Sequence, residues 1–597
     1  METLDKQMHG KVFPPADGGD LFTVNSRPDV TLVCEGLDPA LVEAVLQTNA
    51  AVCDDRHDDA RLMLLDTVMP AVDRIFTIDS SRTDLLYITA RLLADVGLKE
   101  QARERYQLLS VSMDQVDLWV ELARLTEADY ARQTEALTYW RRALALAPDR
   151  LSIQLGHVVC QTNCGKTSAG VKHLVQLLSH KEDTLRVELG LLWDANYLPD
   201  YNRADFHAWS LRIGKRFAEE VCWWRDTIRS FDPERPLRVG ILSAEFKGNA
   251  PLRCYDGFLK SKDRDRLELY AYSTTEEEGR QFDDYRPYYQ AIRDIRPMTA
   301  DQAAACICND AIDILIPVGG YCYGSRPDIL ARQPAPIQVD LGGITSWGFP
   351  QMSYRITDEL LDPPDSQPYY TEQLAYFSQG VMAFRPPEES PLVSPLPARR
   401  NGFVTFGSFN NHRKISNVTL DLWCRVLRQV SDARMVLKFP YAVDKGIVER
   451  LQEAFQQRGV SSDRLSFCGC CEYQNHLMLL GDVDLLLDTY PFNGARTTME
   501  GLWMGVPTVT LSGETFVSRQ GHSIYHALGV DAFVAKTQQD YVERACRFAG
   551  QLDSLNRIRH ALRPLFLNSP VCNPEYFSRE MEQILRGFWY RFCREHG

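Results

Sequence analysis

The sequence lacks the features of an exported or membrane-spanning protein. Residues 1–20 contain no apolar core of a signal peptide, and no run of about 18 or more apolar residues occurs in the 597-residue chain. We therefore expect a cytoplasmic protein with no membrane-spanning segment. In that compartment the 16 cysteines are expected to be reduced thiols rather than disulfides.

The spacing of a metal site is also absent. The tightest cysteine groups, Cys306/Cys308 and Cys468/Cys470/Cys471, do not form the paired CxxC clusters of structural zinc, and no histidine pair accompanies them. We expect free thiols at these positions. We also expect a protein that needs no metal ion or other cofactor.

An excess of positive charge is missing as well. Lys and Arg number 66 against 80 Asp and Glu, so the formal net charge is −14. Broad nucleic-acid binding needs a basic surface, so we expect no nucleic-acid partner, although a local basic pocket for a phosphorylated small molecule is compatible with this charge. A chain of this length is expected to fold as about three or four domains.

What the sequence does contain first is a helical region. A Pro- and Gly-rich N-terminus, 1–30, is expected to be flexible, and 31–184 has the pattern of helices without a clear strand. Small and aromatic residues recur there every 34 residues: Ala102, Tyr106 and Leu109, then Ala136, Trp140 and Ala143, then Gly170, Leu174 and Leu177. This interval favours tetratricopeptide-like (TPR-like) repeats over a plain helical bundle, and either arrangement predicts a scaffold or a partner-docking surface.

A helical linker over 185–235 is followed by a change of period. Short apolar runs then alternate with helical stretches, which predicts parallel sheets covered by helices. The runs are 237–242, 267–273 and 313–320 in a first lobe, 236–390, and 403–410, 433–439, 464–469, 484–490 and 506–511 in a second lobe, 400–597. The sequence therefore predicts an α/β fold of two Rossmann-like lobes behind the helical region.

The first candidate site lies in FGSFNNHRKIS (406–416). A strand ends within this segment, a polar turn follows, and Lys414 lies near the start of the next helix. Free backbone N–H groups at the start of a helix suit phosphate, and a lysine ammonium can neutralise the charge on a leaving diphosphate. The alternative is a solvated lysine on a loop.

The second candidate site lies in DTYPFNGARTTMEGLWMGVPTVTL (488–511). After a tight turn, a helix opens with Arg496, Thr497 and Thr498, whose N–H and hydroxyl groups can bind an anion. Glu500, in the first turns of that helix, can accept hydrogen bonds from a ribose diol. The alternative is that the threonines only cap the helix.

Together with 332–358 and the NYLPD-containing linker, these two segments resemble the catalytic half of the O-GlcNAc transferase/SPINDLY family. The resemblance covers about 185–590 and is most specific in NGARTTMEGLWMGVP. It implies a GT-B fold and a TPR-like region that docks a protein acceptor. It also implies inverting, metal-independent transfer of a sugar to Ser/Thr hydroxyls of proteins. The default donor is UDP-GlcNAc, and GDP-fucose is the alternative.

The resemblance also implies roles for individual residues. Lys414 matches an essential diphosphate-binding lysine, so it is the candidate catalytic residue. The other candidate nucleotide-sugar-binding residues are Asn411 and His476 at the nucleotide, Arg496, Thr497 and Thr498 at the diphosphate-binding turn, and Glu500 at the ribose.

One position departs from the family pattern. In the loop after the first strand, Asn249 falls where the family has a histidine, the proposed general base. Asparagine cannot accept a proton at neutral pH. Three hypotheses follow: an active transferase whose proton leaves through the donor phosphate, Asp313 or water; a catalytically degenerate nucleotide-sugar-binding or scaffold protein; or a relative with a different donor or acceptor.

Overall fold

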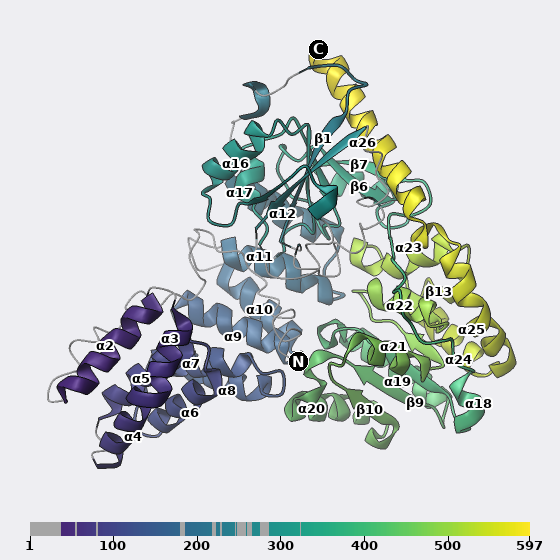
Figure 1. Cartoon of the computed structure of the whole chain (residues 1–597). Helices are drawn as coiled ribbons and strands as arrows, with labels where there is room; N and C mark the ends of the chain where they lie inside the picture. Colours follow the sequence, from purple (N-terminus) through teal and green to yellow (C-terminus); the bar gives the residue numbers. More distant parts are fainter. Residues whose placement is uncertain are drawn as a thin grey trace. The chain divides into compact units, whose positions relative to one another are not determined.

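Figure 1 shows the structure of the chain, a computed structural model. It describes residues 38–53, 56–78, 82–178, 185–217, 223–226, 230–244, 246, 258, 266–274, 286–322 and 324–597. These residues form two compact units. The helical unit lies within 19–170 and includes 443–447, and the larger unit covers the described parts of 171–442 and 448–597.

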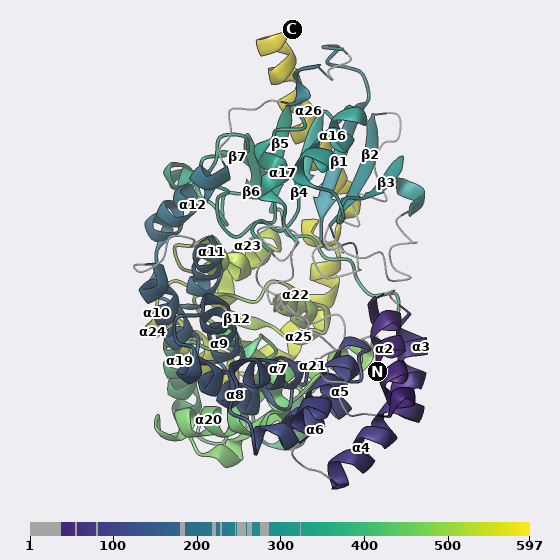
Figure 2. The same cartoon turned by 90° about the vertical axis from the view of Figure 1, so that its left-hand side faces the viewer.

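The helical unit is built from helices that pack in sequence order. α5 packs against α6, α7 against α8 and α8 against α9 (Figure 2). The elements are α2 (Pro39–Cys53), α3 (His57–Met63), the π-helical η2 (Leu64–Val68), α4 (Met69–Ile78), α5 (Thr83–Asp95), α6 (Lys99–Ser110), α7 (Val116–Glu127), α8 (Gln133–Leu146) and α9 (Leu151–Asn163), with α10 (Thr167–Leu178) following.

The residues that recur in the sequence lie where these helices meet. Ala102, Tyr106, Ala136 and Trp140 are fully buried. Gly156 on α9 faces the Trp140 ring so closely that a Cβ there would lie 2.3 Å from a ring carbon. Small residues thus let neighbouring helices touch while an aromatic ring fills the space between them, as in TPR-like repeats. The predicted helical-repeat region is confirmed.

The linker consists of α11 (Leu185–Asp194), η3 (Ala195–Tyr197), α12 (Arg203–Phe217) and η4 (Trp223–Asp226). α12 lies directly on a loop of the first lobe. A Cβ on Gly214 would lie 2.2 Å from the carbonyl oxygen of Gly348, and one on Gly348 would lie 1.9 Å from that of Ser210. Only glycine allows so close an approach of two backbones, so the linker is fixed to the first lobe.

The first lobe contains a seven-stranded parallel sheet in the order β3-β2-β1-β4-β5-β6-β7. Its strands are β1 (Leu237–Ser243), β2 (Leu267–Ser273), β3 (Ala291–Asp294), β4 (Ile314–Pro317), β5 (Ile337–Leu341), β6 (Tyr354–Asp358) and β7 (Gln373–Phe377), with helical segments η5 (Arg286–Tyr288), α16 (Ala300–Asn309), α17 (Pro327–Ala331) and η6 (Pro364–Tyr369).

The second lobe contains a six-stranded parallel sheet in the order β10-β9-β8-β11-β12-β13. Its strands are β8 (Thr405–Ser408), β9 (Arg434–Lys438), β10 (Leu465–Cys468), β11 (Leu485–Leu487), β12 (Thr508–Leu511) and β13 (Val534–Ala535). The helical segments are α18 (Pro397–Asn401), η7 (His412–Lys414), α19 (Asn417–Gln429), η8 (Pro440–Val443), α20 (Lys445–Gln456), η9 (Ser462–Arg464), α21 (Tyr473–Gly481), α22 (Arg496–Trp503), η10 (Phe516–Ser518), α23 (Gln520–Ala527), η11 (Asp531–Phe533), α24 (Gln538–Ala549), α25 (Leu552–Leu567), η12 (Pro570–Cys572) and α26 (Pro574–His596).

Both sheets share one doubly wound topology. The first and fourth strands of each lobe are neighbours, β1 with β4 and β8 with β11, and the remaining strands extend outward on either side. The winding reverses between these two strands, and ligands of such folds bind there, outside the carboxyl ends of the strands. The predicted pair of Rossmann-like lobes is confirmed.

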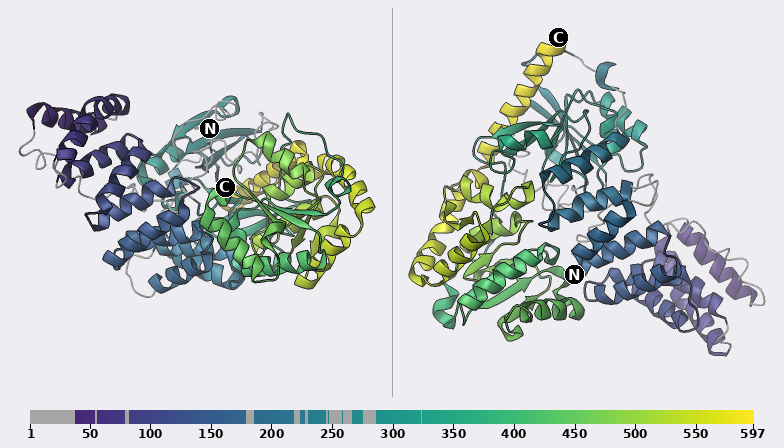
Figure 3. Two further views of the ribbon diagram at one scale, coloured as in Figure 1. Left: turned by 90° about the horizontal axis from the view of Figure 1, so that it is seen from below. Right: turned by 180° about the vertical axis from the view of Figure 1, so that it is seen from behind.

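The last helix of the chain packs on the first sheet. Phe588 and Trp589 of α26 share a buried core with β1, β2, β4 and β5, and Phe588 stacks on Tyr354 with ring centroids 3.8 Å apart. Figure 1 and Figure 3 show α26, in yellow, running along this lobe. The sequence pattern placed all of 400–597 in the second lobe, because the pattern of an amphipathic helix does not specify which sheet the helix covers.

A matched pair of glycines in helices tests the close contact of the linker. Gly214→Ala on α12 is expected to destabilise the protein by about 1–3 kcal/mol, since the new methyl group would collide with backbone. Gly587→Ala on α26, where nothing lies within 4 Å, is expected to stabilise it by about 0.5–1 kcal/mol through helix propensity. Urea unfolding measures both; equal changes in the two variants would contradict the packing described.

Candidate active site

The predicted site residues gather at the switch point of the second sheet. The segment after β8 carries Asn410 and, in η7, Lys414. The segment after β11 carries Asp488 and leads into α22. Because the carboxyl ends of neighbouring parallel strands lie at the same edge of a sheet, the two candidate segments of the sequence meet there.

Asp488 joins the two segments. Its side chain is 1% exposed. Oδ1 accepts hydrogen bonds from the backbone N–H groups of Thr489 (2.9 Å) and Gly494 (2.8 Å) and from Nδ2 of Asn410 (3.2 Å). Oδ2 accepts one from Oγ1 of Thr510 (2.7 Å). Burial raises the pKa of this carboxyl to about 6, against the effect of these donors. Four donors from three segments thus converge on one buried acceptor.

The N-terminus of α22 has no side-chain cap. The N-cap position, Ala495, makes no side-chain cap hydrogen bond. Oγ1 of Thr497 donates instead to Oδ1 of Asn410 (3.1 Å), and Oγ1 of Thr498 donates to the carbonyl oxygen of Gly494 (2.7 Å). Neither threonine caps the helix, so the capping alternative is wrong. The first N–H groups of the helix are therefore not capped by its own threonines, and a helix start of this kind can bind an anion.

Lys414 lies beside the same turn. Its Nζ donates to the carbonyl oxygen of Asn493 (2.8 Å) and lies 4.1 Å from the centre of the Phe492 ring. Burial lowers the pKa of the ammonium group to about 8, although the Asp488 carboxylate opposes the shift. A partly desolvated cation therefore stands next to the open helix start, which suits a diphosphate.

Glu500, Arg496 and His476 form a second group. Glu500 is buried; its Oε1 accepts from Nε of Arg496 (2.8 Å), and its Oε2 lies 3.0 Å from Nε2 of His476. Tyr473 stacks on His476 and lies under the Arg496 guanidinium. Burial alone would raise the pKa of Glu500, but the hydrogen bond to His476 and the charge of Arg496 hold it below its ordinary value. Glu500 is thus a carboxylate that can accept further hydrogen bonds.

Three other residues of the sequence analysis lie outside these two buried groups. Asn411 is exposed, and its side chain accepts from the N–H of Arg413 (3.0 Å) at the start of η7. Asn249 lies outside the described residues. Asp313 precedes β4, at the sheet edge opposite the carboxyl ends, and pairs with Arg235 (2.6 Å). A carboxylate so placed and paired cannot take a proton from an acceptor at this site, so the Asp313 route is wrong.

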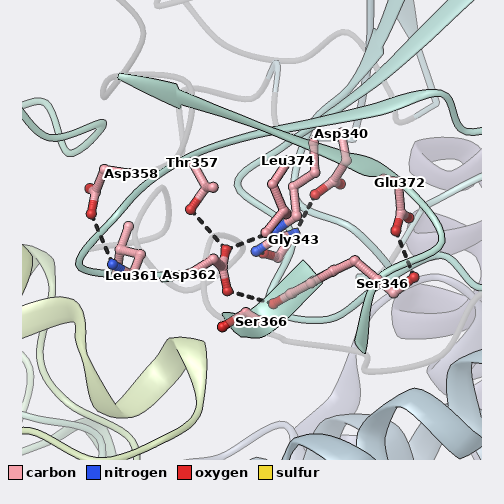
Figure 4. Close-up of polar contacts among 12 residues, drawn as sticks. Asp340, Gly343, Ser346, Thr357, Asp358, Leu361, Asp362, Ser366, Glu372 and Leu374 are labelled. Atoms are coloured by element: carbon pink, nitrogen blue, oxygen red, sulfur yellow. Dashed lines mark hydrogen bonds and ion pairs between the residues drawn. The ribbon is translucent and has the colours of Figure 1, made fainter. Parts of the chain in front are cut away.

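The first lobe contributes a loop fixed by buried charge (Figure 4). Arg355 is 1% exposed and pairs with Asp340 and Asp362. Glu372, also buried, accepts hydrogen bonds from a hydroxyl and a backbone N–H of the loop 342–348 that follows β5. Burial raises the pKa of both Asp340 and Glu372. Removing one partner of such a network leaves an uncompensated charge in the core, so this loop is held firmly in place.

Two features are absent from the described ranges. No group of three or more His, Cys, Asp or Glu residues among them is arranged to hold a metal ion. In the same part of the chain, no helix has the length and apolar character needed to cross a membrane.

A model of glycosyltransferase family 41 matches residues 223–383 and 396–581, more than half of the chain. The chain belongs to glycosyltransferase family 41. A similar protein is "Probable UDP-N-acetylglucosamine–peptide N-acetylglucosaminyltransferase SPINDLY" of Solanum lycopersicum, 31% identical over 392 residues that cover 64% of this chain and 42% of the relative. The UDP-N-acetylglucosamine–peptide N-acetylglucosaminyltransferase of Caenorhabditis elegans is 24% identical over 474 residues, covering 60% and 41%. The chain thus spans less than half the length of the curated relatives it matches.

A solved structure is similar over most of this family 41 chain. It is a mutant of the O-GlcNAc transferase of Thermobaculum terrenum, with a TM-score of 0.79 and 28% sequence identity. The similarity covers 87% of this chain and 99% of that one. It confirms the predicted fold class, a GT-B fold of two Rossmann-like lobes preceded by a helical-repeat region.

Sequence reasoning missed two residues of this family 41 site. Asp488 and Phe492 received no role, although Asp488 follows an apolar strand directly before a Gly-containing turn. A carboxylate at that place can organise the turn, which is the signal that was available. For Phe492 no local signal exists, because its contact with Lys414 joins segments about 80 positions apart.

The role of Asp488 in stability can be tested with an isosteric change. Asp488→Asn replaces a double acceptor by an amide that faces several donors, and we expect a loss of about 1–3 kcal/mol of unfolding free energy. Asp482→Asn is the control, because Asp482 is exposed and its ion pair with Arg400 (3.6 Å) is on the surface. Chemical unfolding of both variants measures the difference; equal stabilities would show that the carboxylate is dispensable.

Proposed function

We propose that this chain is a transferase that moves N-acetylglucosamine from UDP-N-acetylglucosamine to serine and threonine hydroxyls of proteins. The observation that carries the proposal is the position of Lys414 beside the open start of α22, at the switch point of the second sheet. Names of the similar proteins refer to transfer from UDP-N-acetylglucosamine to peptides, which supports the choice of donor and acceptor.

The diphosphate of the donor binds at the turn before α22. Backbone N–H groups at the helix start and the positive end of its dipole meet the phosphate oxygens. Lys414 supplies a full positive charge where negative charge develops as the bond to the sugar breaks. Thr497 and Thr498 fix the turn, since their hydroxyls hold Asn410 and Gly494. Charge neutralisation by Lys414 supports the predicted metal-independent reaction.

The nucleoside binds beside the diphosphate. The Glu500 carboxylate accepts hydrogen bonds from the ribose diol, while Arg496 and His476 keep it ionised and fix its orientation. His476 lies against Phe409, which follows β8. In this proposal the base binds beside the His476 ring. Asn411 lies on the exposed rim and contacts the nucleotide from there.

The proton of the acceptor hydroxyl leaves through the donor phosphate or water, since Asn249 cannot take it. Stabilisation of the leaving group and positioning of the two substrates supply most of the rate. Inversion at the sugar, docking of the protein acceptor on the TPR-like region, the five-part domain division and the cytoplasmic location all stay predictions. A catalytically degenerate nucleotide-sugar-binding protein and a GDP-fucose-dependent O-fucosyltransferase are the alternatives, and both use the same diphosphate site.

The donor is tested by thermal unfolding of the purified chain with UDP-N-acetylglucosamine, GDP-fucose, UDP or GDP. A ligand present at 100 times its Kd stabilises the native state by about 2.7 kcal/mol, so the true donor gives a clear rise in Tm. We expect the rise with the UDP ligands, followed by sugar transfer to Ser/Thr-containing peptides detected by mass spectrometry. A rise with GDP-fucose alone would identify the alternative donor, binding without turnover would favour the degenerate protein, and no rise would refute the proposal.

The pKa of Lys414, about 8, predicts how UDP affinity depends on pH. The ammonium form binds the diphosphate, so affinity is constant below pH 8 and falls by up to about tenfold per pH unit above it. Lys414→Arg is the matched variant, because a guanidinium keeps its charge through this range and should give a constant affinity. Lys414→Met should lose about 10²–10³-fold in transfer rate.

Isothermal titration between pH 6.5 and 9.5 measures these affinities. An equal fall of affinity with pH in the wild type and in Lys414→Arg would assign the pH dependence to another group. Near-normal transfer by Lys414→Met would refute the role of the lysine.

A further inference from the structure

The linker reaches the proposed diphosphate site through Tyr197. This residue ends η3 in the NYLPD segment, and its side chain is 6% exposed. It lies in a compact apolar group, here named the seam cluster, with Leu361, Phe492, Phe516 and Val517. Leu361 belongs to the first lobe and the other three to the second, so the linker meets both lobes at this point.

Tyr197 contacts both segments that hold Lys414. Its ring stacks on Phe492, with centroids 5.4 Å apart and planes 22° from parallel. Its hydroxyl lies close enough to the guanidinium of Arg413, the residue directly before Lys414, for each group to affect the pKa of the other. Phe492 in turn lies under the Lys414 ammonium at 4.1 Å. One side chain thus touches the lysine's chain neighbour and the aromatic ring against which the lysine rests.

The linker is anchored independently of the diphosphate site. Nδ2 of Asn196 donates to the carbonyl oxygen of Leu192 (2.8 Å), which holds η3 on α11. Arg203, at the start of α12, donates to Oγ of Ser366 in the first lobe (2.8 Å). Together with the close backbone approach at Gly214, these contacts place Tyr197 from outside the second lobe. Its position therefore does not depend on the turn that it contacts.

We propose that Tyr197 is a positioning residue that keeps Lys414 aimed at the phosphate-binding turn, through its contacts with Phe492 and Arg413. The inference rests on the proposed role of Lys414 in diphosphate binding. The cation–π contact of Lys414 with Phe492 and the stack of Tyr197 on Phe492 each contribute only modestly. Together they hold the Phe492 ring in place and so restrict the rotamers of the lysine. Because Tyr197 is anchored on the first lobe, its contacts with Phe492 and Arg413 connect that lobe to the diphosphate site in the second lobe.

The test compares Tyr197→Leu and Tyr197→Phe in the full-length chain. Two measurements are made: UDP affinity by isothermal titration at pH 7.5, and the titration of Lys414 by competitive acetylation and mass spectrometry between pH 6 and 11. Tyr197→Leu removes the stack and admits water, so we expect about tenfold weaker UDP binding and a pKa of Lys414 that moves toward its ordinary, higher value. Tyr197→Phe keeps the stack and loses only the Arg413 contact, so a smaller loss is expected.

Phe516→Leu is the matched control. It removes a ring from the same seam cluster, but that ring lies over the Arg355 guanidinium at 4.8 Å. It should lower Tm as much as Tyr197→Leu does while leaving UDP affinity and the lysine titration at their wild-type values. If the two leucine variants behave alike in both measurements, Tyr197 is only a packing residue and the proposal is overturned.

The acetylation measurement also separates this proposal from the proposed function. If the wild type binds no UDP, the proposed function fails, yet a shift of the Lys414 titration in Tyr197→Leu alone would still support the positioning contact. If Tyr197→Leu does not fold, Tyr197→Phe decides: unchanged affinity and an unchanged titration would overturn the proposal.

Discussion

The candidate site depends on a buried carboxylate. Asp488 accepts hydrogen bonds from Asn410 after β8, from Gly494 before α22 and from Thr510 of β12. Parallel strands bring their carboxyl ends to one edge of a sheet, but they do not by themselves fix the loops that leave those ends. An acceptor placed in the middle does so, because each loop donates to it and none can move without leaving a buried charge unsatisfied.

The same burial sets the charges around the diphosphate position. Lys414 is partly desolvated, and a nearby carboxylate keeps its pKa from falling further than about 8. Glu500 keeps its negative charge because His476 and Arg496 are bonded to it, so it does not cancel the lysine. The site thus separates the cation proposed to bind the phosphates from the compensated carboxylate proposed to bind the ribose. Lys414 is balanced by the Asp488 carboxylate, and Glu500 is balanced by Arg496 and His476. The positive and negative groups can therefore lie close together without cancelling each other.

The sequence predicted what local patterns determine. β1 and β2 are mostly apolar runs, and the periodic positions Tyr106 and Trp140 are fully buried, because each pattern reflects the burial of its own element. The two candidate segments were predictable for the same reason, since a polar turn after an apolar strand is a local feature. Contacts between segments that are distant in the sequence were not predictable. The stacking of Tyr197 on Phe492 and the packing of α26 on the first sheet depend on topology, to which no single stretch of sequence refers.

The two lobes carry different parts of the proposed reaction, and this difference bears on the substitution at Asn249. Breaking the bond to the sugar places full negative charge on the diphosphate, and a fixed cation and fixed dipoles can stabilise that charge. The acceptor hydroxyl, in contrast, needs to lose its proton only as the new bond forms, and the phosphate or water can then take it. Lys414, the open start of α22 and Asp488 all lie in the second lobe. A change at position 249, which follows β1 in the sequence, therefore leaves the larger electrostatic contribution intact, and it is this contribution that an active transferase cannot replace.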